Sequence, residues 1–177
     1  DNRELFKKAM TDEMTDLYNH SSFNVRMDNE IREHAERRKT FGLLLLDLDH
    51  FKKVNDTYGH LVGDIVLKVA AQCLKDFCRS TDVAARYGGE EFAIILPDIE
   101  ESSLYLIGER LRKSIENLVI PIPDQAKPLK VTASIGLSVF PKNGKTTTDI
   151  IAAADEALYQ VKNSGRNGAL ISKRLAS

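Results

Sequence analysis

The chain has 177 residues, of which 42% are hydrophobic and 29% charged, and its 25 Lys and Arg residues are balanced by 26 Asp and Glu residues. This length suits one folded domain with short tails, and the composition is that of an ordinary globular protein, not of a disordered or membrane chain. The charge balance provides no basic excess of the kind that binds polynucleotides, so we expect no nucleic acid polymer as a partner.

The first ten residues, 1–10, are charged and helix-prone, and we expect them to be a linker helix that follows an upstream regulatory region. The longest apolar run, 41–46, is far shorter than the roughly 18 residues that a membrane span needs. Cys73 and Cys78 have a spacing that suits neither a zinc pair nor a disulfide framework, so both are expected to be free thiols. We therefore expect a cytoplasmic segment that makes no membrane contact itself, whether or not the larger protein to which it belongs is anchored in a membrane.

The first half of the chain alternates helix and strand patterns. Residues 21–39 read as an amphipathic helix whose inward positions are Phe23, Met27, Ile31 and Ala35. Residues 41–49 (FGLLLLDLD) are a continuous apolar run, which is typical of a buried central strand that emerges at its carboxyl end. Residues 59–63 read as a loop. The helix predicted over 64–77 has as its inward face Val66, Val69, Ala70, Cys73 and Phe77.

The second half begins with a hairpin signal. Gly88 and Gly89 separate two short apolar runs, 83–87 and 91–96, and two glycines accept the positive φ of a tight turn. A helix is predicted over 103–118.

A strand is predicted next over 131–139, then a helix over 147–163, which Gly165 ends, and a last strand over 169–171. The expected buried face of that final helix is Ile150, Ile151, Ala154, Leu158 and Val161. The βαββαβ order with flanking helices predicts an α+β fold, in which helices pack on an antiparallel-rich sheet.

Two acidic clusters carry the chemistry. Asp47 and Asp49 end the buried strand and point to the same side of it, so their carboxylates can converge on Mg²⁺, which prefers hard oxygen ligands. A solvated strand end would explain the same two residues. The second cluster, Glu90 and Glu91, lies at the tip of the glycine hairpin, where adjacent like charges repel each other unless a cation compensates them. A polar surface hairpin is the alternative there.

Together the motifs resemble the GGDEF family of diguanylate cyclases. Residues 88–92 read GGEEF, a variant of the family signature, and residues 47–64 read DLDHFKKVNDTYGHLVGD. The resemblance extends over roughly 11–170 and includes VTASIG at 131–136, and ADEALY at 154–159 followed by Lys162 and GRN at 165–167. It implies a core similar to the palm of nucleotidyl cyclases and polymerases.

The resemblance also implies a division of the chain and a reaction. The linker helix would be 1–10, the catalytic domain 11–172 and the tail 173–177. Two GTP molecules, one on each domain of a homodimer, would condense to cyclic di-GMP and two pyrophosphates as each 3′-hydroxyl attacks the other nucleotide's α-phosphorus. The product would inhibit the enzyme.

The metal and catalytic residues follow from the same resemblance. Two Mg²⁺ or Mn²⁺ ions per GTP site would be held by Asp47, Glu90 and the carbonyl of Leu48, with Glu91 completing the second position. Glu90 would also help to deprotonate the 3′-hydroxyl. Lys52 would stabilise charge on the phosphates, so the catalytic set is Glu90, Lys52 and Asp47.

Substrate contacts are implied residue by residue. The phosphates would be held by the backbone at Phe51 and by Lys52, Lys162 and Arg166. Asn55 and Asp64 match the guanine readers, since a carboxylate accepts from the N1 and N2 donors of guanine. The remaining expected contacts are His60, which could instead cap the next helix, and Gly88 and Gly89, which let a ligand approach the backbone.

Arg79 and Asp82 match the RxxD product-inhibition site of the family, although an ordinary helix-end ion pair has the same residues. The chain departs from the family at residues 14–22 (MTDLYNHSS), where a threonine-glycine-leucine and two arginines usually stand. That departure affects expected contacts near the nucleotide entrance or the domain surface.

Three other functions share some of these features. A catalytically silent GGDEF domain could act as a receptor for GTP or cyclic di-GMP, or as a dimerisation module, but such domains normally lose the acids that are present here. An enzyme making cyclic GMP-AMP would be expected to lack Asp64. Polymerase-like transfer on DNA would need a basic template groove.

Overall fold

The computed structural model describes all residues, 1–177. Its strands are β1 (Phe41–Leu48), β2 (Val83–Arg86), β3 (Glu91–Leu96), β4 (Ala133–Phe140) and β5 (Gly168–Ile171). Its helices are α1 (Asn2–Met10), α2 (His20–Arg37), α3 (Phe51–Tyr58), α4 (His60–Phe77), α5 (Glu101–Glu116) and α6 (Thr147–Asn163). The predicted α+β class is confirmed.

The five strands form one sheet in the order β2-β3-β1-β4-β5, in which only the β4-β5 pair is parallel. The central strand β1 is buried along its whole length, as its continuous apolar run predicts. Its ladders with β3 and β4 place Asp47 opposite Glu91 on one side and Ser134 on the other. The register therefore brings one predicted acid of each cluster to the same end of the sheet.

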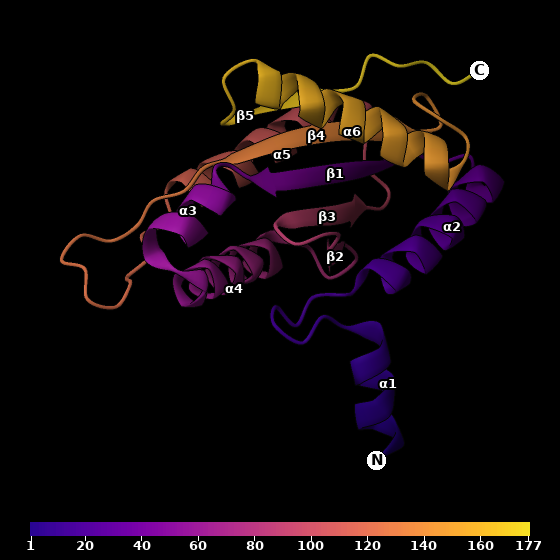
Figure 1. The fold of residues 1–177 in the computed structure, drawn as a ribbon. Coiled ribbons are helices and arrows are strands. Elements are labelled where there is room, and N and C mark those ends of the chain that lie inside the picture. Colours follow the sequence, from indigo (N-terminus) through magenta and orange to yellow (C-terminus); the bar gives the residue numbers. More distant parts are fainter.

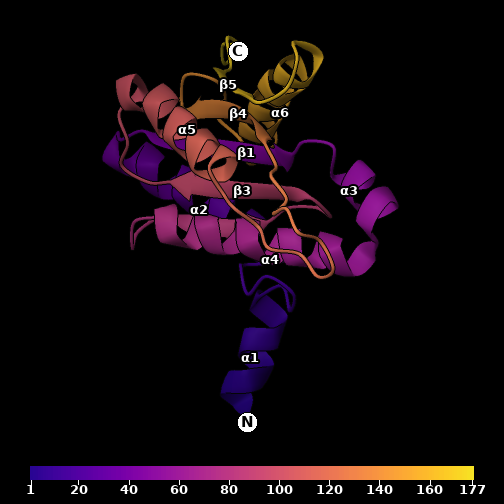
Figure 2. The same ribbon diagram turned by 90° about the vertical axis from the view of Figure 1, so that its left-hand side faces the viewer.

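Helices cover both faces of the sheet and make two cores (Figures 1 and 2). Leu44 and Leu46 of β1 belong to the larger core, beneath α4 and α5. Leu43 and Leu45 alternate to the other face and pack in the smaller core, beneath α2 and α6. Helix α1 projects away from both layers and has no buried residue.

The contact between β4 and α6 depends on Gly136. A Cβ atom at this position would lie 2.1 Å from the carbonyl oxygen of Ala154 and 2.5 Å from the backbone nitrogen of Leu158. Helix α6 therefore rests directly on the strand backbone. Lys162, one turn beyond Leu158, is carried by the same helix to the end of β1.

Several predicted boundaries were wrong. Helix α3 was not predicted at all, and α4 begins at His60, inside the range predicted as a loop. The break between them is Gly59, whose φ of 92° suits a residue without a Cβ. The buried face of α4 includes Leu67 and Leu74, whereas Val69, Cys73 and Phe77 of the predicted face are only partly buried.

The hairpin between β2 and β3 was predicted, but the reason given for its glycines was wrong. The glycines with positive φ are Gly59 and Gly165, not Gly88 or Gly89. At Gly88 the constraint is space, since a Cβ there would lie 2.7 Å from the Oε2 atom of Glu91. The predicted burial of Ala35 on α2 was also wrong, because that residue is exposed.

Both cysteines are free and partly buried, and burial raises the pKa of the Cys78 thiol to about 12. None of the helices combines the length and the apolar character that crossing a bilayer requires.

Candidate active site

Three acidic side chains gather where β1 and the β2-β3 hairpin end. Asp47 pairs with Glu91 in the β1-β3 ladder, and the N–H of Leu48 donates to the carbonyl of Glu90 at 3.3 Å. The two clusters found in the sequence are thus joined by backbone hydrogen bonds. Because the ladder fixes both chains, the separation of these carboxylates is set by the sheet and not by flexible loops.

The acids are only partly compensated. Asp47 is 6% exposed, and its Oδ2 atom forms an ion pair with the Lys162 ammonium. Burial raises the pKa of Glu90 above its ordinary value, the charge of Asp47 raises it further, and Lys162 partly opposes both. Burial and then Asp47 likewise raise the pKa of Glu91. Repulsion among the three carboxylates is therefore built into the fold.

Most of the predicted phosphate and metal residues line one cavity of about 470 Å³, the acid cavity. The predicted members among its lining residues are Asp47, Leu48, Phe51, Lys52, Glu90, Lys162 and Arg166. They come from β1, α3, the hairpin and the end of α6. With Lys53 and Asp56, which also line the cavity, four cationic side chains and three carboxylates face one space. Such a site can hold a polyanion together with a compensating cation.

The donor set fits a magnesium ion. The structure contains no group of three or more His, Cys, Asp or Glu side chains at ligand spacing. Mg²⁺ does not require such a group, because it takes one or two protein carboxylates and fills its other positions with water and phosphate oxygens. Asp47 and Glu90 supply two carboxylates to the same cavity, and the Lys162 ammonium against Asp47 shows that a cation is favoured there.

Other predicted residues lie outside this cavity. The Oδ1 atom of Asn55 lies against Gly63 of α4, so closely that a Cβ at Gly63 would be 1.8 Å away from it. Asp64 follows Gly63 and is partly buried, whereas His60 is exposed at the start of α4. The side chain of Glu91 folds over Gly88. Asn55 and Asp64 thus both lie at the α3-α4 junction and not in the acid cavity.

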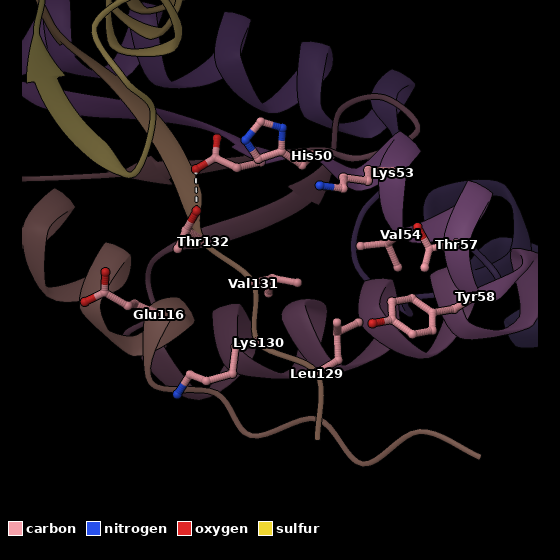
Figure 3. Close-up of a pocket in the computed structure, with 11 residues that line it drawn as sticks. His50, Lys53, Val54, Thr57, Tyr58, Glu116, Leu129, Lys130, Val131 and Thr132 are labelled. Carbon is pink, nitrogen blue, oxygen red and sulfur yellow. Dashed lines mark hydrogen bonds between the residues drawn. The ribbon is translucent and has the colours of Figure 1, made fainter. Parts of the chain in front are cut away.

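The carboxylates of Asp47 and Asp49 were predicted to converge on one site, but the structure separates them. Asp49 is 5% exposed and accepts hydrogen bonds from Thr132 Oγ1 at 2.7 Å, Ser134 Oγ at 2.6 Å and the Asn167 N–H at 2.9 Å. It lines a second cavity, of about 380 Å³, on the other side of α3. Figure 3 shows that cavity, with Thr132 and His50 near one end and Tyr58 at the other. Asp49 joins β1, β4 and the loop before β5.

Arg79 and Asp82 form a closed pair at the start of β2. The Arg79 guanidinium donates to Asp82 Oδ1 from Nε at 3.1 Å and from Nη2 at 2.8 Å, and Nη2 also donates to the carbonyl of Pro97 at 2.8 Å. The side chain of Asp82 is 3% exposed and that of Arg79 is 51% exposed. Neither residue lines the acid cavity.

Sequence reasoning missed Arg86, which holds the hairpin. Its guanidinium donates to the carbonyls of Gly88 at 3.2 Å and Gly89 at 2.8 Å, and to both carboxylate oxygens of Asp12 at 3.2 Å. The only signal in the sequence is a cation placed two residues before a glycine turn. Arg86 links the acidic hairpin to the segment that joins α1 and α2.

The residues that depart from the family pattern anchor α2. Asn19 caps the helix by accepting from the N–H of Ser22 at 2.9 Å, and Ser22 Oγ donates to the carbonyl of Met10 at 2.7 Å. The ring of His20 stacks on Tyr87 at 4.6 Å between centroids. None of these residues lines the acid cavity.

Comparison with known proteins agrees with this geometry. The profile of the family described as "Diguanylate cyclase, GGDEF domain" matches residues 9–168. Diguanylate cyclase A of Treponema denticola is 40% identical over 175 residues, which are 97% of this chain and 47% of that protein. The probable diguanylate cyclase DgcT of Escherichia coli is 39% identical over 92% of this chain and 36% of its own length. The chain thus spans less than half the length of these relatives.

Solved structures resemble the fold closely. The coiled coil and GGDEF domain of DgcB from Caulobacter crescentus, in complex with c-di-GMP, has a TM-score of 0.91 and 31% identity, covering 97% of this chain and 90% of that one. The diguanylate cyclase SiaD of Pseudomonas aeruginosa, in complex with its activator SiaC, has a TM-score of 0.89 and 33% identity, covering 97% and 65%.

Proposed function

The chain belongs to the GGDEF family of diguanylate cyclases, and from this premise we propose that it condenses two GTP molecules into cyclic di-GMP and two pyrophosphates. The observation that carries the proposal is the cavity in which Asp47 and Glu90 face Lys52, Lys162 and Arg166. This mixture of acids and cations around one space suits a nucleotide triphosphate with its metal. The mixture does not suit a simple anion, because the acids would repel it.

The triphosphate would be held by groups already in the cavity. Lys52 lies in the first turn of α3, and Lys162 and Arg166 lie at the end of α6 and just beyond it. Arg166 can bind a phosphate with two parallel hydrogen bonds, whereas the two lysines act as point charges. The backbone at Phe51 would add a donor from the start of α3.

GGDEF cyclases depend on divalent metal, and we propose two Mg²⁺ or Mn²⁺ ions per GTP site, held by Asp47, Glu90, Glu91 and the carbonyl of Leu48. When bound, these ions supply charge neutralisation on the phosphates and a lower pKa for the attacking hydroxyl. Lys162 leaves Asp47 in this arrangement and turns to phosphate. The repulsion that raises the pKa of Glu90 and of Glu91 is thereby relieved.

Glu90 is proposed as the group that takes the 3′-hydroxyl proton. Its carboxylate lines the same cavity as Lys52, Lys162 and Arg166, so it lies beside the phosphates that those side chains would hold. Lys52 would stabilise the charge that develops on the phosphates as the bond to pyrophosphate breaks. Catalysis in this scheme rests on Glu90, Lys52 and Asp47.

Guanine would be read at the α3-α4 junction, by the Asn55 amide and the Asp64 carboxylate, with His60 near the entrance. The absence of a side chain at Gly63, the residue before Asp64, lets the Asn55 amide lie against α4. Gly88 and Gly89 would leave the hairpin backbone open to the ligand.

One domain holds half of the reactants, so the reaction needs a homodimer of the catalytic domain, residues 11–172. We propose that α1, within residues 1–10, raises the local concentration of the second domain as a linker helix, and that 173–177 is a tail. A cytoplasmic location would supply the GTP.

Product feedback would act through Arg79 and Asp82. Their ion pair closes the edge of Asp82 that a guanine would need, so product binding requires Arg79 to release Asp82 and turn outward. Because the Arg79 guanidinium is half exposed, that movement needs no change in the core.

Chromatographic analysis of products tests the proposal. The parent chain and Glu90→Gln would be incubated with GTP and Mg²⁺ over a range of protein concentrations, and cyclic di-GMP and pyrophosphate quantified. We expect product from the parent at a rate that rises with the square of protein concentration, and at least about 100-fold less from Glu90→Gln. Glu33→Gln, an exposed change of equal charge on α2, serves as the control.

Two outcomes would contradict the proposal. Equal rates for the parent and Glu90→Gln would exclude the acid cavity as the catalytic site. Absence of cyclic di-GMP at every protein concentration, including in a chain fused to a dimerising helix, would instead support a silent domain that serves as a receptor or dimerisation module.

A further inference from the structure

A third cavity lies at the opposite end of β1 from the acids. It measures about 510 Å³ and is bounded by the end of α2, the start of β1 and the connection from β4 to α6. In Figure 1 this region is the right-hand end of the sheet, where α2 leads into β1. It shares no residue with the acid cavity.

Three cations from two separate segments surround this cavity. Arg38 is the C-cap of α2, Lys39 follows it, and Lys145 immediately precedes Thr146, the N-cap of α6. All three are exposed, and none of their side chains forms an ion pair or a hydrogen bond within the protein. No acidic residue lines the cavity. Its net charge is therefore positive and uncompensated.

Three acids of α2 and its neighbouring loop have other partners, and two more, Glu33 and Glu36 of α2, are exposed and do not line the cavity. Asp98 binds Arg37 at 3.1 Å and lies beside His34, and the carboxylate of Glu30 lies 3.2 Å from the same histidine. Asp28 accepts a hydrogen bond from Thr147 at 2.5 Å. No acidic side chain therefore faces the three cations from within the cavity.

Helix electrostatics account for only part of this arrangement. Basic residues favour a helix C-terminus, which would explain Arg38 and Lys39. However, two of the final carbonyls of α2 are already bonded. The Arg38 N–H donates to the carbonyl of Ala35 at 3.4 Å, and the Lys39 N–H donates to the carbonyl of His34 at 2.9 Å. Lys145 belongs to another segment, which the C-terminus of α2 does not explain.

The floor of the cavity is apolar. Phe140 is 4% exposed and stacks on Phe41 with ring centroids 5.2 Å apart. Ile31 and Pro141 continue this surface. Ligand sites in proteins commonly combine such an apolar floor with a few charged groups at the rim.

We propose that this cavity is a second ligand site, which binds a small organic anion with an apolar body and two or three phosphate or carboxylate groups. The apolar body lies on Ile31, Phe140 and Pro141, and the anionic groups meet Arg38, Lys39 and Lys145. Its charge pattern differs from that of the acid cavity, so the ligand needs no metal. The proposal does not depend on the cyclase activity.

Fluorescence anisotropy with pyranine, a flat hydroxypyrene that carries three sulfonates, tests this site in the full chain without metal. Titrations compare the parent with the double variant Arg38→Glu and Lys145→Glu. We expect at least about tenfold weaker binding in the variant, because two attractive contacts become repulsive. Lys52→Ala, which weakens anion binding in the acid cavity, should leave the pyranine affinity within about twofold.

A matched control distinguishes pyranine binding in this cavity from general electrostatic attraction to the protein surface. The double variant Lys68→Glu and Lys113→Glu changes net charge by the same amount at exposed positions of α4 and α5. Equal weakening by the two double variants would overturn the proposal, as would unchanged binding after charge reversal at Arg38 and Lys145. Thermal unfolding checks that each variant is folded. If charge reversal prevents folding, Lys145→Gln replaces it, with an expected loss of about threefold and no loss as the overturning result.

Discussion

Two carboxylates two residues apart, Asp47 and Asp49, have opposite environments. Asp49 is buried among neutral donors that bond both of its oxygens, and it ties three segments of the sheet edge together. Asp47 is equally buried but lies beside Glu90 and Glu91, with a single lysine to compensate them.

The difference separates a structural acid from a ligand-binding acid. A carboxylate that serves the fold has its hydrogen bonds satisfied from within the protein. A carboxylate that serves a ligand is left with repulsion or a replaceable partner, which the ligand relieves on binding. Substitutions on the two sides of this comparison should therefore affect different measurements.

The largest expected effect is on turnover in Asp47→Asn. Loss of this carboxylate removes a proposed metal ligand, so we expect cyclic di-GMP formation to fall by at least about 1,000-fold, equivalent to roughly 4 kcal/mol. Stability should be unchanged or higher, because repulsion with Glu90 and Glu91 is removed. Product quantification and urea unfolding measure the two quantities. A large loss of stability would place Asp47 with the structural acids.

For Asp49→Ala we expect the large effect on stability and not on turnover. The change leaves Thr132, Ser134 and the Asn167 N–H without their acceptor at a buried position, so we expect unfolding free energy to fall by about 3 kcal/mol. Urea unfolding measures this loss. Asp56→Ala, an exposed acid on α3, should change stability by less than about 0.5 kcal/mol. Similar unfolding midpoints for the two variants would contradict the structural role of Asp49.

Arg86→Gln should lower both stability and turnover. Losing the guanidinium frees the carbonyls of Gly88 and Gly89 and leaves Asp12 unpaired, at a cost of about 1–2 kcal/mol in stability. The acidic hairpin would also be less fixed, so GTP turnover should fall about tenfold. Hydrogen exchange of the β2-β3 amides should increase. Unchanged exchange there, despite lower activity, would show that Arg86 does not act by holding the hairpin.

The smallest effect concerns pH. The pKa of Glu90 and that of Glu91 lie above their ordinary values, so between those values the folded state holds more protons than the unfolded one. Their contribution to stability therefore falls as pH rises through that window. Relative to the parent, the double variant Glu90→Gln and Glu91→Gln should gain stability as pH rises from about 4 to 8. Thermal unfolding without metal measures this, and a constant difference between the chains would contradict it.

Bound Mg²⁺ should stabilise the parent chain relative to the double variant at neutral pH. Binding to the folded state stabilises it, so added Mg²⁺ with a nonhydrolysable GTP analogue should raise the unfolding temperature of the parent more than that of the double variant. An equal increase would mean that the two glutamates do not hold the metal.

Much of the fold was predictable because its signals are local. The apolar run of β1 and the periodicity of α6 each span a complete element, and α6 has the bounds that its pattern predicts. Helix α3 was missed because only Phe51 and Val54 of its eight residues are buried, which leaves almost no periodic signal. The break at Gly59 then shifted the predicted start of α4.

The candidate site was predictable where a motif carries the residues. Asp47 and Glu90 share a cavity as expected, although 43 positions separate them in the chain. Arg86 and Asp12 were not predictable, since their contact joins residues 74 positions apart and neither lies in the acidic motifs. The donors that satisfy Asp49 also come from distant segments, so the sequence could not distinguish this acid from Asp47.

Gly136 has a consequence for the interpretation of natural sequence variants. It carries no functional group and lies beneath α6, so a substitution there would ordinarily be classed as a packing defect. Yet any side chain at this position must lift α6 from β4, and Lys162 moves with that helix. A variant could therefore be well folded and abundant while having every active-site residue intact and the wrong distance between Lys162 and Asp47. Loss of turnover would then trace to an atom added far from the chemistry.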